Sequence, residues 1–202
     1  MLRNRQSCVA MLGLAGSLAV MACASPQTVA TSAQAANPPG QAIEARAERL
    51  AEALAEAETA HDAGESDRLT RLVRSLRASG VRMAGDDGED MLALWARSAG
   101  VDETPFRGRL LGPAYKRGEL APGERWHSAQ TFVSGKPSTL AVSHNGAGPI
   151  RVSVSDQSSR LVCRPDTARK VACRFTPLYT QRYDIELVNE GSERAVYYLV
   201  FD

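Results

Sequence analysis

The chain has 202 residues, of which 44% are apolar and 23% are charged, and its 24 basic and 23 acidic side chains nearly cancel. This length suffices to bury one medium-sized core or two small ones. The balanced charge excludes a general nucleic-acid binder, which would carry a clear basic excess.

Residues 1–24 have the pattern of an export signal. Arg3 and Arg5 precede an apolar stretch from Val9 to Ala22, and the segment holds no acidic residue. The apolar stretch is typical of a secretory signal and too short to span a bilayer stably. We therefore expect an exported protein.

Two processing outcomes remain open at the end of this signal. Val20-Met21-Ala22 followed by Cys23 resembles the lipobox of bacterial lipoproteins, in which Cys23 would be lipidated. The small residues around Cys23 equally fit an ordinary signal peptidase, which would release a soluble chain at Ser25. The first outcome predicts a lipoprotein anchored to the outer membrane, and the second a periplasmic protein. Residues 25–40 are uncharged and lack periodicity, which predicts a flexible linker.

The spacing of apolar residues predicts three helices in residues 41–100. The first should end before Gly64, the second should run from an N-cap at Ser66 to Gly80, and a short third should cover residues 89–99. The acidic residues 86–90 fit the start of the third helix better than a calcium loop. The stripe of the first helix suits a helical hairpin and, alternatively, a short coiled-coil seam; its members are Ile43, Ala47, Leu50, Leu54 and Ala57.

After Val101, short alternating runs separated by glycine and proline turns replace the helical period. The fold class predicted is therefore α+β, with three short N-terminal helices before an antiparallel, jelly-roll-like β-sandwich over residues 104–202. The last strand, Ala195 to Phe201, is apolar on both faces and should lie centrally or be covered. The expected strands are 126–133, 139–144, 150–156, 160–163, 171–175, 183–188 and 195–201.

Cys163 and Cys173 are the two cysteines outside the export signal. In an oxidising compartment they predict a disulfide, which we expect to join two strands of one hairpin. A metal site would need two further ligands, and no histidine lies between them.

The closing residues resemble a known family of modules. Residues 181–191 and 195–201 are similar to the last strands of bacterial pre-peptidase C-terminal (PPC) β-sandwiches, which read Y-x-I-x-V-x-N, a turn and Y-x-L-x-V. The resemblance covers residues 104–202. It implies a non-catalytic attachment that binds or stabilises. Arg151 and Ser153 stand where this family often has acidic residues, so the resemblance does not extend to a calcium site.

The sequence lacks the common catalytic and nucleotide-binding motifs, and we predict no catalytic residue, no metal and no cofactor. His127 and His144 are the weak metal candidates. A four-residue turn at residues 134–137 would place them opposite each other on paired strands, whereas a slip of one residue would place them on opposite faces. Trp126 and Tyr179 suit either a carbohydrate platform or, more simply, lids on the core.

Residues 151–182 carry seven basic and two acidic side chains. This stretch predicts either a binding face for an anionic partner or a solvated sheet edge. The candidate binding residues are Arg160, Arg164, Arg169, Lys170 and Arg174.

The function that the sequence favours is that of a non-catalytic envelope protein whose sandwich binds an envelope polymer or an envelope protein. An accessory or inhibitor subunit of a secreted hydrolase is one alternative. The other is an enzyme or metal-binding protein that uses His127 and His144. No nucleic-acid partner is expected, and membrane attachment would come from a lipid on Cys23.

Overall fold

The computed structural model describes residues 39–85, 88–101, 112–166, 168 and 170–202. The expected export signal with Cys23, nearly all of the expected linker, and Arg169 lie outside these residues. Asp86 and Asp87 also lie outside them. Residues 36–202 form one compact unit that includes both the helices and the strands.

The three predicted helices are present as α1 (Pro39–Asp62), α2 (Ser66–Ser79) and α3 (Met91–Ser98). Gly80 adopts the left-handed conformation (φ 73°) that ends α2, as its position predicted. The predicted N-cap at Ser66 is wrong by one residue. Glu65 occupies the cap position without a side-chain cap bond, and the Ser66 side chain is exposed.

Asp90 starts α3 and also ties it to the sheet. One carboxylate oxygen accepts hydrogen bonds from the backbone N–H groups of Leu92 (3.1 Å) and Ala93 (3.2 Å). The same oxygen accepts a bond of 2.6 Å from the Tyr115 hydroxyl. Burial, followed by the hydrogen bond to Asp90, raises the pKa of Tyr115. The helix-start interpretation of this acidic segment is therefore confirmed at Asp90.

Replacing Asp90 by alanine should lower the free energy of unfolding by about 1–2 kcal/mol, because the cap is lost and the Tyr115 hydroxyl loses its acceptor. Urea denaturation followed by circular dichroism measures this. Asp90→Asn should retain most of the cap, and Glu89→Ala, at an exposed neighbour, is the matched control. A loss at Asp90→Ala no larger than the loss at Glu89→Ala would show that the cap does not hold α3.

Within the described residues, nine strands form two sheets. The five-stranded sheet has the order β1-β2-β9-β4-β7, and the four-stranded sheet has the order β3-β8-β5-β6. Their pairs are antiparallel except β1 with β2. The strands are β1 (Arg82–Met83), β2 (Ala114–Leu120), β3 (Arg125–Phe132), β4 (Ser138–His144), β5 (Ile150–Ser155), β6 (Leu161–Cys163), β7 (Lys170–Phe175), β8 (Gln181–Asn189) and β9 (Ala195–Phe201).

The predicted sandwich with a preceding helical region is therefore correct, but two predicted hairpins are wrong. β3 pairs with β8, while β4 pairs with β7 and β9 in the other sheet. β6 and β7 also lie in different sheets. In both places the chain crosses from one sheet to the other instead of folding back within one.

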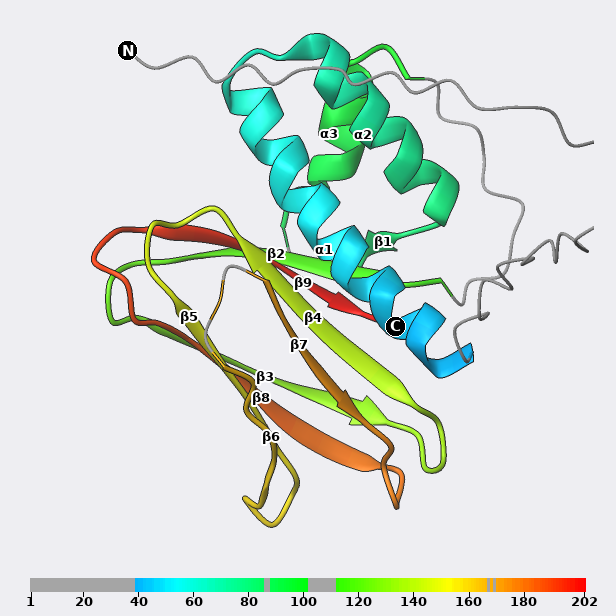
Figure 1. The fold of residues 1–202 in the computed structure, drawn as a ribbon, viewed down its shortest axis with the longest axis vertical. Helices are drawn as coiled ribbons and strands as arrows, with labels where there is room; N and C mark the ends of the chain where they lie inside the picture. The colour runs from blue at the N-terminus through cyan, green and yellow to red at the C-terminus, as the bar shows by residue number, and fades with distance from the viewer. Residues whose placement is uncertain (1–38, 86–87, 102–111, 167, 169) are drawn as a thin grey trace, which may run out of the picture. The chain divides into compact units, whose positions relative to one another are not determined.

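The elements of this unit form three layers (Figure 1). The helices cover one face of the five-stranded sheet, and one apolar cluster joins buried residues of α1, α2 and α3 to Tyr115, Ala141, Tyr198 and Val200 of that sheet. A second apolar cluster fills the space between the two sheets. The five-stranded sheet is thus covered on both faces, which explains why β4 is buried on both faces and β9 is apolar on both.

This arrangement accounts for the stripe of α1. Ala47, Leu50, Leu54 and Ala57 are buried in the chain's own helix–sheet cluster, while the side chain of the fifth predicted member, Ile43, lies outside what the structure describes. The hairpin interpretation is therefore confirmed, since α1 packs against α2 and against β4 and β9. The central position predicted for β9 is confirmed as well.

Candidate binding surface

The structure separates the two histidines that the sequence offered as metal candidates. The exposed His127 lies on β3, where its Nε2 is 3.7 Å from a Glu186 carboxylate oxygen. His144 is buried at the end of β4, with Nε2 3.3 Å from the Ala168 carbonyl oxygen. The described residues contain no group of three or more histidine, cysteine, aspartate or glutamate side chains that could hold a metal ion.

The predicted disulfide between Cys163 and Cys173 is present, with 5.7 Å between the two Cα atoms. It joins β6 of the four-stranded sheet to β7 of the five-stranded sheet. The expectation that it crosses a single hairpin is therefore wrong. The bond closes one edge of the sandwich between its two layers, and Cys173 is fully buried.

Most of the described residues of the basic stretch contact carboxylates of the chain itself. Lys170 Nζ lies 2.7 Å from Glu52 of α1, and Arg174 pairs with Glu48 of the same helix. Arg160 lies 2.9 Å from Asp156. Arg164 is exposed and has no ion-pair partner among the residues that the structure describes. Two of the proposed anion-binding residues thus hold α1 against the edge strand β7.

A buried polar group that the sequence analysis missed lies between α1 and the five-stranded sheet. Glu58 of α1 is 5% exposed and accepts hydrogen bonds from Arg117 Nε (3.0 Å) and Nη2 (2.5 Å) of β2. The Tyr198 hydroxyl donates a third bond to it. We call these three residues the Glu58 cluster.

The electrostatics of the Glu58 cluster are those of a satisfied structural contact. Burial raises the pKa of Glu58, but the hydrogen bonds from Arg117 and Tyr198 outweigh burial and bring the pKa below its ordinary value. Burial and the bond to Glu58 raise the pKa of Tyr198. Each polar group of the cluster has a partner within the chain, since Arg117 Nη2 also lies 3.5 Å from Glu119.

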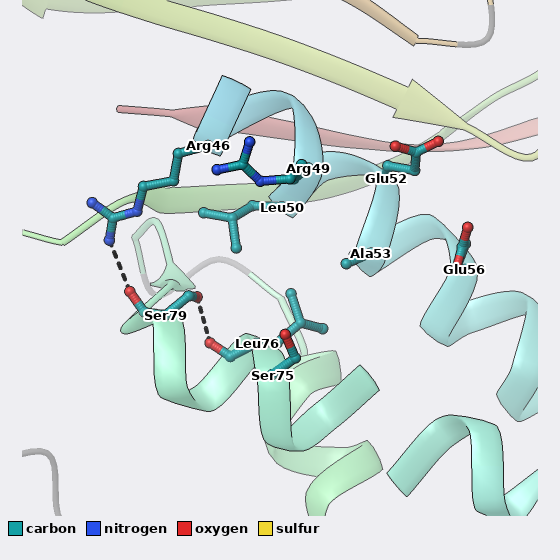
Figure 2. A pocket seen from close by; sticks show the side chains of 9 residues that line it. All are labelled: Arg46, Arg49, Leu50, Glu52, Ala53, Glu56, Ser75, Leu76 and Ser79. Carbon is teal, nitrogen blue, oxygen red and sulfur yellow. Dashed lines mark hydrogen bonds between the residues drawn. The ribbon is translucent and has the colours of Figure 1, made fainter. Parts of the chain in front are cut away.

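A pocket of about 520 Å³ lies between α1 and α2 (Figure 2). Arg46 crosses one end of it, where Nη2 donates to the Ser79 carbonyl oxygen at 2.8 Å. Two arginines and two glutamates line it, so its charge is balanced and favours no ionic ligand. The lining residues are Arg46, Arg49, Leu50, Glu52, Ala53, Glu56, Ser75, Leu76 and Ser79.

The strongest candidate for a binding surface lies at one end of the sandwich. Val133, Leu178 and Tyr179 are 47%, 75% and 73% exposed, and we call this group the apolar end. Among the described residues, the only other exposed large apolar side chain is Leu161. Apolar side chains that gather on a protein surface mark an interaction site more often than singly exposed ones do.

Two neighbouring loops carry the apolar end, and they are tied to each other. The loops are residues 133–137 between β3 and β4, and residues 176–180 between β7 and β8. Ser134 N–H donates to Thr180 Oγ1 (3.0 Å), Ser134 Oγ donates to the Leu178 carbonyl oxygen (2.7 Å), and Gly135 N–H donates to the Pro177 carbonyl oxygen (2.9 Å). Figure 1 shows both loops at the lower right, at the same end of the two sheets.

An aromatic cluster supports these loops from inside the sandwich. The ring centroids of Phe132, Phe175 and Tyr183 lie 5.0–5.6 Å from one another. Packed aromatic rings of this kind fix the strand ends from which the loops project. The apolar end is therefore displayed on a rigid base.

The two ends of the sandwich differ in charge. Residues 131–139 and 174–182 contain three basic side chains (Lys136, Arg174 and Arg182) and no acidic one. The turns at the opposite end, residues 121–124 and 190–194, contain three glutamates and one arginine.

The expectation that Tyr179 is a core lid is wrong, because its side chain is exposed. Trp126 is half-buried and packs on Tyr197, with ring centroids 5.8 Å apart.

No protein-family model matches the chain, and no curated protein sequence does either. Solved structures similar to it include the pre-peptidase C-terminal domain of a Bacillus anthracis collagenase. That match has 12% identity and a TM-score of 0.40, and it covers 44% of this chain and 88% of that domain. A PPC domain, the family that the sequence resembles, is thus among the similar structures.

Two further matches are also to bacterial proteins. The Aeromonas hydrophila PliG, a periplasmic inhibitor of g-type lysozyme, has 15% identity and a TM-score of 0.35 over 45% of this chain and 84% of that one. A CBM6 module of the laminarinase LamC from Zobellia galactanivorans has 9% identity and a TM-score of 0.30, and the match covers 45% of this chain and 90% of that one.

Among the described residues, no helix has the length and apolar character needed to cross a membrane.

Proposed function

We propose that this protein is a non-catalytic binding module, exported to the bacterial cell envelope, and that it binds through the apolar end. The observation that carries the proposal is the display of Leu178 and Tyr179 on two loops that hydrogen bonds hold together. Leaving such side chains in water forgoes the free energy of their burial, which amounts to about 1.5–3 kcal/mol for a fully buried leucine. A partner that covers them recovers it.

The character of the loops supports binding rather than chance exposure. Tyrosine is enriched among the residues that dominate binding energy, because it buries a large area and loses little side-chain entropy. The hydrogen bonds between the loops fix the backbone before binding, which reduces the entropy lost on association. The export signal expected in residues 1–24 supports an envelope location for the partner.

Site-specific photo-crosslinking tests the proposal. Tyr179 is replaced by p-benzoylphenylalanine in the native host, and the exposed Glu193 at the opposite end is replaced in the same way as a control. We expect a light-dependent adduct of defined composition from position 179 and none from position 193. Absence of any adduct at 179, or equal adducts at both positions, would show that the apolar end is not the binding surface.

A further inference from the structure

The size, side chains and charge of the apolar end indicate the kind of partner that binds it. On the basis of the proposed function, we infer that the apolar end inserts into the surface of an anionic phospholipid bilayer, with Lys136 and Arg182 against the headgroup phosphates. Three observations support this partner: the small size of the apolar end, the types of its side chains and the charge around it.

The first observation is size. A stable protein–protein interface buries about 800 Å² on each partner and uses roughly 20–30 residues a side. The apolar end consists of three large side chains on two loops, residues 133–137 and 176–180. Both loops lie at one end of the sandwich (Figure 1). A bilayer suits such a small group because its interfacial region needs no matching shape, and binding there scales with the apolar area inserted.

The second observation is the kind of side chain displayed. Leu178 is purely apolar, and Tyr179 beside it joins an apolar ring to a polar hydroxyl. Tyrosine is enriched where membrane proteins meet the headgroup region, since its ring and its hydroxyl prefer opposite sides of that boundary. The pair therefore matches the gradient of polarity that a bilayer surface offers.

The third observation is charge. Lys136 lies within the first loop and Arg182 two residues after the second; both are exposed and have no ion-pair partner among the described residues. Arg174 already pairs with Glu48. Asp202 lies nearby, next to Thr139, and it pairs with Arg46 at 3.9 Å. Asp184, exposed two residues after Arg182 on β8, is a further acidic side chain at this end. The rim then holds four basic side chains (Arg46, Lys136, Arg174 and Arg182) and three acidic ones (Glu48, Asp184 and Asp202), so it is net positive and attracts the phosphates of an anionic lipid surface.

Fluorescence and vesicle binding test this inference. The chain is purified after export with Cys23→Ser, so that no expected lipid anchor contributes to binding. Tyr179→Trp places a reporter at the apolar end, and Glu193→Trp places the same reporter at the opposite end. Trp95 and Trp126 also emit, so the emission of each reporter is taken as the difference between the variant and the wild type. With vesicles of phosphatidylglycerol and phosphatidylcholine in equal amounts, emission from the reporter at position 179 should shift to the blue and be quenched by brominated acyl chains. Emission from the reporter at position 193 should do neither.

Matched variants assign the binding to individual side chains. Leu178→Ser should weaken vesicle binding about tenfold, and Lys136→Glu should weaken it severalfold. Arg194→Glu, at the other end, should leave it unchanged, and pure phosphatidylcholine should bind less than the mixture. Circular dichroism checks that each variant is folded. We expect all of them to fold, because the substituted side chains are exposed.

The outcomes separate this inference from the proposed function. If no vesicle binding occurs, or if Leu178→Ser does not weaken it, the lipid assignment is overturned. A protein adduct from position 179 in cells, together with no vesicle binding, would leave the binding module in place with a protein as its partner. Neither vesicle binding nor any adduct would overturn both.

Discussion

Replacing Glu58 by alanine is expected to lower the free energy of unfolding by about 3 kcal/mol, because the partly buried Arg117 guanidinium loses both hydrogen bonds to Glu58 and keeps only a contact of 3.5 Å with the exposed Glu119. The Tyr198 hydroxyl loses its acceptor in the same variant. Urea denaturation followed by tryptophan fluorescence measures the change, since the buried Trp95 lies 6.1 Å, centroid to centroid, from Tyr198.

Two further variants show whether the loss comes from the uncompensated charge. Glu58→Met combined with Arg117→Met should recover the part of the stability that the charge of Arg117 costs, because a buried ion pair is often replaceable by apolar side chains. The part that comes from the Tyr198 hydroxyl should remain lost, since that hydroxyl still lacks its acceptor. Glu52→Ala, which breaks the exposed pair with Lys170, should cost less than about 1 kcal/mol. Equal losses for Glu58→Ala and Glu52→Ala would mean that the Glu58 cluster does not hold α1 on the sheet.

The Glu58 cluster should also make stability depend on pH. The pKa of Glu58 is lower in the folded chain than its ordinary value, so its stabilisation is complete above the pKa of an unfolded glutamate, about 4.3. The stabilisation is then lost as the pH falls through the folded pKa. The difference in stability between the wild type and Glu58→Ala should therefore shrink under acid conditions.

Removing the disulfide with Cys163→Ala and Cys173→Ala is expected to lower the free energy of unfolding by about 3 kcal/mol. The bond spans a sequence separation of 10 residues, and closing a loop of that size restricts the unfolded chain by about this amount. Because the bond joins the two sheets at β6, amide hydrogen exchange should rise most in this short edge strand.

Reduction of the wild type supplies the matched control for this prediction. The wild type in excess dithiothreitol should unfold at the same urea concentration as the double variant. A loss below about 1 kcal/mol in both would show that apolar contacts alone close this edge. Free thiols in protein isolated from its native host would also contradict the expected oxidising compartment.

The helices and seven of the nine strands in the described residues could be predicted because their signals are local. The stripe of α1, the left-handed Gly80 and the alternation of β5 and β8 each depend on residues a few positions apart. β9 was placed correctly because a strand that is apolar on both faces must be covered on both.

Strand pairing was predicted less well, because the turn residues do not record which sheet the next strand joins. The Gly135 turn (φ 73°) looks like a hairpin turn, yet the chain crosses there between the two layers. The same ambiguity hid the inter-sheet position of Cys163 and Cys173. β2 was missed because its charged run, Lys116 to Glu119, is typical of a loop. The structure shows why a strand can carry these charges: Glu58, from a helix distant in the sequence, pairs with Arg117.

The candidate site was missed for a related reason. Val133, Leu178 and Tyr179 are unremarkable in the sequence, since a single apolar residue near a turn can be either buried or exposed. These three side chains come together on the surface because the β3–β4 loop, which connects the two sheets, lies beside the β7–β8 loop and is hydrogen-bonded to it. A proline and threonine-rich loop that carries adjacent leucine and tyrosine was the available signal.

Photo-crosslinking from position 179 in living cells tests the central claim most directly. If the apolar end is the binding surface, light should join position 179 to one class of envelope molecule, while position 193 stays unreacted. Adducts from position 193 with none from position 179 would place the binding surface at the opposite end of the sandwich and contradict the claim.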